Sequence, residues 1–168
     1  MMVCFSLGSN LGDKLTNLRQ ALVLLAERLG SPISVSSVYE TEPWGVVHHE
    51  NYLNLATCYE TSLRPEKVYT IISSIEKELG RTRSKNTIEP RTIDIDLLFY
   101  NGLILKTETL IIPHPRIKYR KFVLIPLTEI MENFIHPETG LTIKDLLLQC
   151  PDNGAVVKTD LKLFSHDV

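Results

Sequence analysis

The chain has 168 residues, 43% of them hydrophobic, and a formal net charge of −2 at pH 7. This size and composition are typical of one compact domain, taken here as residues 1–168, and no apolar run approaches the ~20 residues of a membrane span. We therefore expect no membrane association. The start of the chain has no basic segment leading into a long apolar one, so we expect no signal peptide and a cytoplasmic location.

The three cysteines, Cys4, Cys58 and Cys150, lie far apart and form no CxxC pair. An odd number at this spacing indicates reduced thiols in a cytoplasm rather than a disulfide framework or a zinc site. Each cysteine has apolar neighbours in the sequence, so we expect all three to pack in the core.

The first half of the chain alternates apolar strands with amphipathic helices. A short apolar run is followed by "GSNLGD", a turn in which Asp13 is the expected N-cap of a helix. Gly30 and Pro32 end that helix, and Pro65 and Gly80 bound a second one. We expect strands at 2–7, 33–39, 52–60 and 92–100, and helices at 15–29, 65–79 and 142–150.

The second half is less regular. "NG" at Asn101-Gly102 predicts a hairpin turn into a strand at 103–105, and residues 113–132 are expected to be irregular or partly helical. Beyond a core of about residues 3–150, residues 151–168 form a C-terminal extension without an assigned role. The order βαββαβ predicts an α+β fold of the ferredoxin-like type, an antiparallel sheet with helices on one face. The other face, left free of helices, could bind a ligand.

The expected strand "PRTIDIDLLFY" carries Asp94 and Asp96 two residues apart. Residues at this spacing point to the same face of a strand. Asp is a poor strand former and like charges repel, so the pair predicts a site where two Mg²⁺ ions are held together with substrate phosphates. The alternative is an ordinary alternating strand with its polar side in solvent.

Two basic clusters accompany this strand. "GRTRSKNTIEPR" contains Arg81, Arg83 and Arg91, and "PRIKYRK" contains Arg116 and Arg120. Arginine forks bind phosphate oxygens bidentately, so carboxylates, metal ions and arginines together predict a phosphoryl-transfer site. A solvated surface is the alternative for either cluster taken alone. "GSNLGDK" lacks the spacing of a Walker A motif.

Six segments occur in order and at fitting distances: "SLGSNLGD", "TEPWG", "NYLNLA", "IEKELGR", "PRTIDIDLL" and "PHPRIKYRKFVLIPL". Together, over about residues 3–150, they resemble the 6-hydroxymethyl-7,8-dihydropterin pyrophosphokinases of folate biosynthesis. The resemblance implies the ferredoxin-like fold and a reaction in which ATP gives its β,γ-diphosphate to the pterin hydroxymethyl oxygen and AMP leaves. The implied partners are ATP and the dihydropterin. We expect no nucleic-acid partner and favour a monomer.

The resemblance also implies roles for individual residues. Asp94 and Asp96 would hold the two Mg²⁺ ions, and with Arg81 and Arg91 they form the expected catalytic set. The expected ATP-binding residues, with Arg83 and Arg116 added from the basic clusters, are Glu76, Arg81, Arg83, Arg91, His114, Arg116 and Arg120. The expected pterin-binding residues are Thr41, Pro43, Gly45, Tyr52, Asn54, Asp94 and Phe122.

The chemistry of a pterin fits the last set. A flat heteroaromatic ring with a donor–acceptor edge is matched by aromatic faces, which Tyr52 and Phe122 could supply, and by the amide of Asn54. Core packing is the alternative for the two aromatic residues, and a simple turn role is the alternative for His114.

The sequence departs from the family pattern in places. Ile88-Glu89 stands where Trp-Gly often precedes "PRT", and Pro115 stands where an aromatic residue is often found. We expect residues 80–90 to be mobile without ligand and to close over ATP.

Two other functions are considered. One is a polymerase- or cyclase-like palm, which attacks the α-phosphate and releases pyrophosphate. The other is an RNA-recognition module, but the sheet lacks the interleaved aromatic residues that such modules use.

Overall fold

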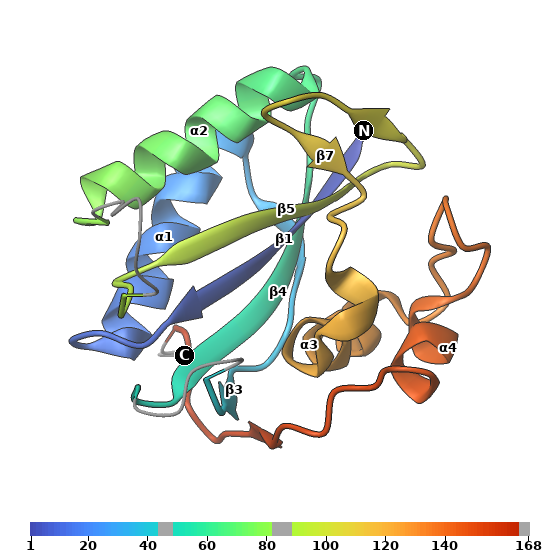
Figure 1. Ribbon diagram of the computed structural model, residues 1–168. Coiled ribbons are helices and arrows are strands. Elements are labelled where there is room, and N and C mark those ends of the chain that lie inside the picture. The colour runs from blue at the N-terminus through green and yellow to red at the C-terminus, as the bar shows by residue number, and fades with distance from the viewer. Residues whose placement is uncertain (44–48, 82–88, 165–168) are drawn as a thin grey trace.

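The structure, a computed structural model, describes residues 1–43, 49–81 and 89–164. One antiparallel sheet runs through the molecule in the order β5-β1-β4-β3-β8, and β2 also pairs with β4 (Figure 1). Its strands are β1 (Met2–Ser9), β2 (Pro32–Val35), β3 (Tyr39–Thr41), β4 (Tyr52–Glu60), β5 (Asp94–Tyr100) and β8 (Val156–Lys158). A separate pair joins β6 (Leu105–Lys106) and β7 (Ile111–Ile112).

Among the described residues, the helices α1 (Lys14–Leu29), α2 (Pro65–Glu78) and α3 (Lys121–Met131) pack on this sheet, and α4 (Ile143–Leu148) packs against α3. The expected end signals operate at α1, where the Asp13 side chain accepts a hydrogen bond from the Thr16 N–H and Gly30, at φ 92°, ends the helix. Pro65 begins α2 as predicted. The α+β, ferredoxin-like fold class is confirmed. In the described part of the chain, no helix has both the length and the apolar character needed to cross a membrane.

The two faces of the sheet carry separate hydrophobic cores. Side chains alternate along β1, so Val3, Phe5 and Leu7 join the core beneath α1 and α2, while Cys4 joins the core beneath α3 and α4. The expectation of a face free of helices is therefore wrong. The segment 113–132 contributes an apolar helix of 11 residues, whose interior Pro126 obscures the helical pattern in the sequence.

One end of that second face is not covered by α3, and it is there that the site lies. Gly8 of β1 pairs with Asn54 of β4 on one side and with Asp94 of β5 on the other. Partners in an antiparallel ladder point to the same face. The three residues therefore lie side by side on the open end of the sheet.

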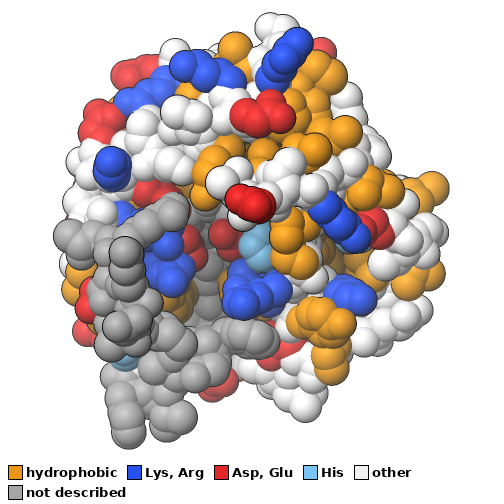
Figure 2. Space-filling view, turned by 45° about the horizontal axis from the view of Figure 1, so that its top comes forward, with side chains coloured by type: hydrophobic (Ala, Val, Ile, Leu, Met, Phe, Trp, Pro, Cys, Tyr) orange, Lys and Arg blue, Asp and Glu red, His pale blue; other side chains and the backbone are white. Residues whose placement is uncertain are grey.

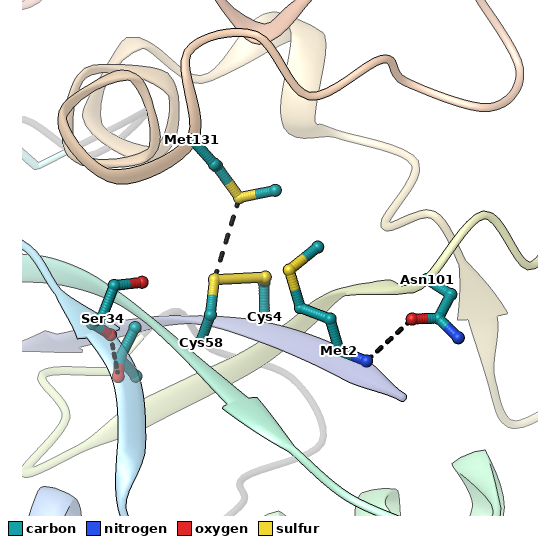
Figure 3. The surroundings of a disulfide bond; sticks show 7 residues. Met2, Cys4, Ser34, Cys58, Asn101 and Met131 are labelled. Atoms are coloured by element: carbon teal, nitrogen blue, oxygen red, sulfur yellow. Dashed lines mark hydrogen bonds between the residues drawn. A yellow bond between two sulfur atoms is a disulfide. The ribbon is translucent and has the colours of Figure 1, made fainter.

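The expectation of three reduced thiols is wrong for one pair, because Cys4 and Cys58 form a disulfide (Figure 3). The two residues are opposite each other on β1 and β4, a relationship that their separation of 54 positions does not reveal. The Cys58 Sγ also contacts the Met131 Sδ at 3.8 Å. Both cysteines are buried as expected, and Cys150 is free and half-buried. The cytoplasmic location stays a prediction, now without the support of the thiols.

Three local expectations also change. The strand expected at 33–39 is divided into β2 and β3, because the Ser36 hydroxyl replaces a backbone group and accepts from the Ala56 N–H. The turn at Asn101 is present, with φ 46°, but β6 after it pairs with β7 rather than with β5. The C-terminal extension contains β8, which adds an edge strand beside β3.

Candidate active site

Two cavities meet at the start of β5. The larger, of about 470 Å³, lies against α2, β5 and the segment 108–115, and the smaller, of about 150 Å³, lies on the open end of the sheet. Arg91, Asp94 and Asp96 line both cavities. Figure 2 shows a face of the molecule on which basic and acidic side chains gather beside a histidine. The carboxylate pair is thus the boundary between two places where ligands could sit.

Asp94 and Asp96 share a face of β5, as predicted from their spacing. Their register partners on β1 are Gly8 and Ser6, which belong to the face turned away from α1 and α2. Both carboxylates are half-buried, with 24% and 27% of their side chains exposed. Groups of three or more His, Cys, Asp or Glu side chains that could hold a metal do not occur among the described residues. A cation here would therefore need further oxygen ligands from a bound molecule or from water.

Three arginines neutralise this pair. Arg91 donates to the Asp94 Oδ2 at 2.7 Å, and Arg81 lies 2.8 Å from the Asp94 Oδ1. Arg120 donates to the Asp96 Oδ2 at 3.2 Å. These arginines come from two regions that are remote in sequence, and the fold brings them together as the basic clusters predicted.

Glu76 of α2 fixes part of this arrangement from beneath. Its Oε1 accepts the Ile95 N–H of β5 at 2.9 Å and forms a short ion pair with Arg81. Only 3% of Glu76 is exposed, although the residue lines the larger cavity. The structure therefore gives Glu76 a positioning role toward β5 and Arg81, and the predicted contact with adenosine stays a prediction.

Burial and charge shift the protonation of two groups on the wall. Burial, and then the neighbouring Asp94, raise the pKa of Asp96 to about 7, although Arg120 opposes them. Burial, and then Arg120 and Arg116, lower the pKa of His114 to about 4. His114 is therefore neutral at pH 7. Because its Nδ1 accepts from the Arg116 N–H at 3.2 Å, its proton lies on Nε2, which is 3.9 Å from Asp96.

The smaller cavity has the aromatic and amide groups that were predicted for it. Tyr52, Asn54, Thr41 and Phe122 all line it. The Asn54 Nδ2 donates to the Thr41 Oγ1 at 2.5 Å, and the Arg120 guanidinium lies 5.6 Å from the centre of the Phe122 ring. One donor of the Asn54 amide is thus used within the protein.

The other predicted residues lie outside the smaller cavity or outside the described part of the chain. Pro43 lines a neighbouring cavity of about 160 Å³, and His114 lines the larger one. Arg116 contacts His114 through its backbone and does not appear among the described lining residues of either main cavity. Gly45, Arg83 and most of the loop expected to close over ATP lie outside the described residues.

Several described residues at the site were missed from the sequence, among them four at or near the smaller cavity. Gly8, Ser6 and Glu42 line the smaller cavity, and Asn10 holds the backbone of Arg91. The segment "SLGSNLGD" was interpreted as a strand and turn and as part of the family resemblance, without a role at the site for Ser6, Gly8 or Asn10. Its signal was the buried polar run Ser9-Asn10 directly after an apolar strand, where polar groups need specific partners.

The fold and the paired carboxylates between two cavities are typical of a nucleotide-dependent transferase. The model of the family 7,8-dihydro-6-hydroxymethylpterin-pyrophosphokinase (HPPK) matches residues 4–132. Because this match covers most of the sequence, the chain belongs to the HPPK family, whose reaction is pyrophosphoryl transfer from ATP to hydroxymethyldihydropterin in folate synthesis.

Individual relatives agree with this assignment. The 2-amino-4-hydroxy-6-hydroxymethyldihydropteridine pyrophosphokinase of Bacillus subtilis is 46% identical over 128 residues, which are 76% of this chain and 76% of that protein. "Folic acid synthesis protein FOL1" of Dictyostelium discoideum is 38% identical over 155 residues, which are 92% of this chain but only 23% of that protein.

Solved structures support the fold. "HPPK-DHPS in complex with substrates" aligns with a TM-score of 0.70 at 18% identity, over 88% of this chain and 43% of that one. Plasmodium falciparum HPPK-DHPS with pteroate aligns with a TM-score of 0.73 at 17% identity, over 88% of this chain and 44% of that one. The chain thus spans less than half of each of these two solved chains.

Proposed function

We propose that this chain is a Mg²⁺-dependent pyrophosphokinase that transfers the β,γ-diphosphate of ATP to the hydroxymethyl group of 6-hydroxymethyl-7,8-dihydropterin and releases AMP. The observation that carries the proposal is that Asp94 and Asp96 line both cavities. A transfer between two substrates needs its charged centre at their boundary, where it can stabilise the group in transit.

The side chains that line the two cavities differ, and each lining suits the chemistry of one of the two substrates. The larger one is open and holds Arg81, Arg91 and His114 near its carboxylates, which suits a triphosphate. The smaller one combines Tyr52, Phe122 and the Asn54 amide, which suits a flat ring with polar edges. We therefore assign ATP to the larger cavity and the dihydropterin to the smaller one.

The residues present fit Mg²⁺. Two carboxylates, without a third such ligand among the residues that the structure describes, match the way this ion is bound through one or two carboxylates plus substrate phosphates. Asp94 and Asp96 would hold two such ions, which would neutralise charge on the transferring group when bound. Burial, and then repulsion from Asp94, raise the pKa of Asp96, and a cation between the carboxylates would reduce that repulsion.

The transfer itself is a substitution at the β-phosphorus. The pterin hydroxymethyl oxygen forms a bond to that phosphorus, the bond to the oxygen shared with the α-phosphate breaks, AMP leaves with that oxygen, and the hydroxyl proton is released. The arginines pair with the carboxylates in the free protein. With cations bound at the carboxylates, Arg81 and Arg91 would be available to the phosphates, and Arg120 would face the group that moves between the cavities.

A product assay tests the proposal. The protein is incubated with Mg²⁺, ATP and 6-hydroxymethyl-7,8-dihydropterin, and the expected products are AMP and the pterin diphosphate. Release of inorganic pyrophosphate instead would indicate attack at the α-phosphate and the palm-like chemistry. Removal of Mg²⁺ with a chelator is expected to stop AMP formation, and persistence of AMP formation would contradict the metal dependence. A cytoplasmic monomer remains the prediction for location and assembly.

A further inference from the structure

The C-terminal extension runs between the two walls of the smaller cavity. Thr41 of β3 belongs to one wall, and Phe122 at the start of α3 belongs to the other. Residues 152–158 pass from the start of α3 to the edge of β3, visible as the red-orange segment in Figure 1. The family match ends at residue 132, so this segment lies outside it.

At the wall that contains Phe122, the extension caps the N-terminus of α3. The N-cap residue of this helix makes no side-chain cap bond of its own. Asp152 supplies the missing acceptor, since its Oδ2 accepts the Lys121 N–H at 3.0 Å and its Oδ1 accepts the Gly154 N–H at 2.8 Å. A carboxylate is favourable at a helix N-terminus because it pairs with free N–H groups and with the helix dipole. The capped N–H lies between Arg120 and Phe122.

At the wall that contains Thr41, the extension forms β8, which pairs with β3. Val156 pairs with Thr41, and Lys158 pairs with Tyr39. Thr41 in turn accepts the hydrogen bond from the Asn54 Nδ2. The short segment 152–158 therefore connects the backbone of α3, which carries Phe122, to the backbone of β3, which carries Thr41, the hydrogen-bond partner of the Asn54 amide.

We propose that Asp152 is a positioning residue for the pterin substrate, because it links α3 to β8 and so sets the separation of Phe122 and Thr41 across the smaller cavity. This inference rests on the proposed function, which assigns the pterin to that cavity. The other end of α3 has an independent anchor in Glu129, which accepts from Ser37 and Tyr39. Loss of the Asp152 cap therefore releases only the end of α3 that faces the substrate.

The two cavities allow this role to be separated from a general loss of stability. The described lining of the larger cavity includes no residue of α3 or of the extension. Arg120, next to the capped N–H, reaches Asp96 at 3.2 Å, so binding of MgATP alone is expected to depend on Asp152 only weakly, and binding of the pterin more strongly. A purely structural cap would affect both ligands equally, through the fraction of folded protein.

The test is a pair of titrations on Asp152→Ala: a non-hydrolysable MgATP analogue alone, and then the pterin in its presence. Pterin binding is expected to weaken by about fivefold to tenfold, the usual range for a lost helix cap, while binding of the analogue changes by less than about twofold. Asp152→Asn, which keeps an acceptor oxygen, is expected to restore most of the pterin affinity.

Thr142→Ala is the matched control, because it removes the N-cap of α4, where the Thr142 Oγ1 accepts the Asp145 N–H at 3.1 Å. It is expected to lower the melting temperature comparably and to leave pterin binding unchanged. Equal weakening of pterin binding in Asp152→Ala and Thr142→Ala, or unchanged binding in Asp152→Ala, overturns the inference. If Asp152→Ala does not fold, Asp152→Ser replaces it and the same results decide. Absence of pterin binding in the unaltered protein would instead contradict the proposed function.

Discussion

Asn10 and Arg91 are joined by two hydrogen bonds across 81 positions of sequence. The Asn10 N–H donates to the Arg91 carbonyl at 3.0 Å, and the Arg91 N–H donates to the Asn10 Oδ1 at 2.7 Å. Asn10 is buried, and the Arg91 guanidinium reaches Asp94. The end of β1 therefore fixes the backbone from which an arginine reaches the boundary of the two cavities.

Asn10→Ala is expected to lower turnover by about tenfold to a hundredfold, because small displacements of a charged group at a reacting centre have effects of this size. The measurement is the rate of AMP formation at saturating substrates. Asn17→Ala is the control, since Asn17 supports the same turn through Ser9 and Leu11 without contacting Arg91. Equal losses of turnover in the two variants would show that the turn, and not the Arg91 contact, matters.

Asp94→Ala and Asp96→Ala are each expected to lower turnover by about a thousandfold or more, since both are assigned to the metal ions. Repulsion between two like charges on one face, taken alone, predicts that removing one of them does little harm to the fold. The structure gives Asp94 two arginine partners, so its loss leaves Arg81 and Arg91 facing each other. We now expect a decrease in the free energy of unfolding of about 1 kcal/mol, measured in urea.

Glu78→Ala provides the comparison for this pair of variants. Glu78 also forms an ion pair with an arginine, Arg28, but on the exposed surface of α1 and α2. Its removal is expected to leave AMP formation unchanged. Turnover retained to within about tenfold in Asp94→Ala or Asp96→Ala would remove these residues from the metal site.

Gly8 gives a test of the floor of the smaller cavity. A Cβ atom at Gly8 would lie 2.5 Å from the Asn54 Oδ1, so Gly8→Ala must displace the amide assigned to the pterin. We expect the pterin affinity to fall by about tenfold or more. Gly102→Ala is the control, because a Cβ atom there meets nothing within 4 Å. Unchanged pterin affinity in Gly8→Ala would mean that the Asn54 amide does not contact the substrate.

The parts of the fold and site that were predictable from the sequence depend on local spacing. Apolar residues at helical spacing defined α1, and the separation of Asp94 and Asp96 by two residues placed both on one face of β5. Such patterns follow from the side-chain periodicity of a single helix or strand, so they can be recognised without knowing how the rest of the chain folds.

The parts that were missed depend on contacts between distant segments. The Cys4–Cys58 disulfide and the Asn10–Arg91 bonds join residues that only the strand register brings together. The strand β8 forms because β3 offers it an edge, and nothing in "AVVK" specifies that partner. Motif resemblance identified residues that line the two cavities more readily than residues that hold those residues in place.

The contact between Glu129 and Tyr39 predicts a dependence of stability on pH. Burial raises the pKa of Glu129, but hydrogen bonds from the Tyr39 hydroxyl and from Ser37 outweigh it and hold the pKa below the ordinary value of 4.5. The same contact, together with burial, raises the pKa of Tyr39. A carboxylate whose pKa is lowered by folding stabilises the protein above its unfolded pKa, and this stabilisation is lost as the pH falls through the folded pKa.

Glu129→Gln is therefore expected to lower the free energy of unfolding by about 1 kcal/mol at pH 7. The difference from the unaltered protein should shrink as the pH falls below about 4.5 and should disappear in more acidic solution. Urea unfolding at several pH values measures it. Glu132→Gln, at the end of the same helix, is the matched control for the loss of one carboxylate. A difference for Glu129→Gln that stays constant with pH would contradict the assignment.

The last prediction concerns Asn54, whose amide makes a hydrogen bond within the protein and also lines the smaller cavity. Its Nδ2 donates to the Thr41 Oγ1, and the residue lines the smaller cavity. Asn54→Leu keeps a similar size but leaves the polar edge of a bound pterin unpaired. Two unmatched hydrogen bonds at roughly 1–3 kcal/mol each would weaken pterin binding by about 30-fold or more. MgATP is assigned to the other side of the carboxylates, so its affinity is expected to change by less than about twofold.

Thr41→Val separates this specificity role from a structural one. It removes the internal partner of the Asn54 amide and retains the amide itself, so pterin binding is expected to weaken much less than in Asn54→Leu. Titrations with the MgATP analogue, and then with the pterin, measure both affinities in each variant. If Asn54 serves only to join β3 to β4, the two variants will lose similar stability and will weaken both ligands alike. That outcome would remove Asn54 from the pterin site and leave the aromatic walls, Tyr52 and Phe122, as the recognition elements of the cavity.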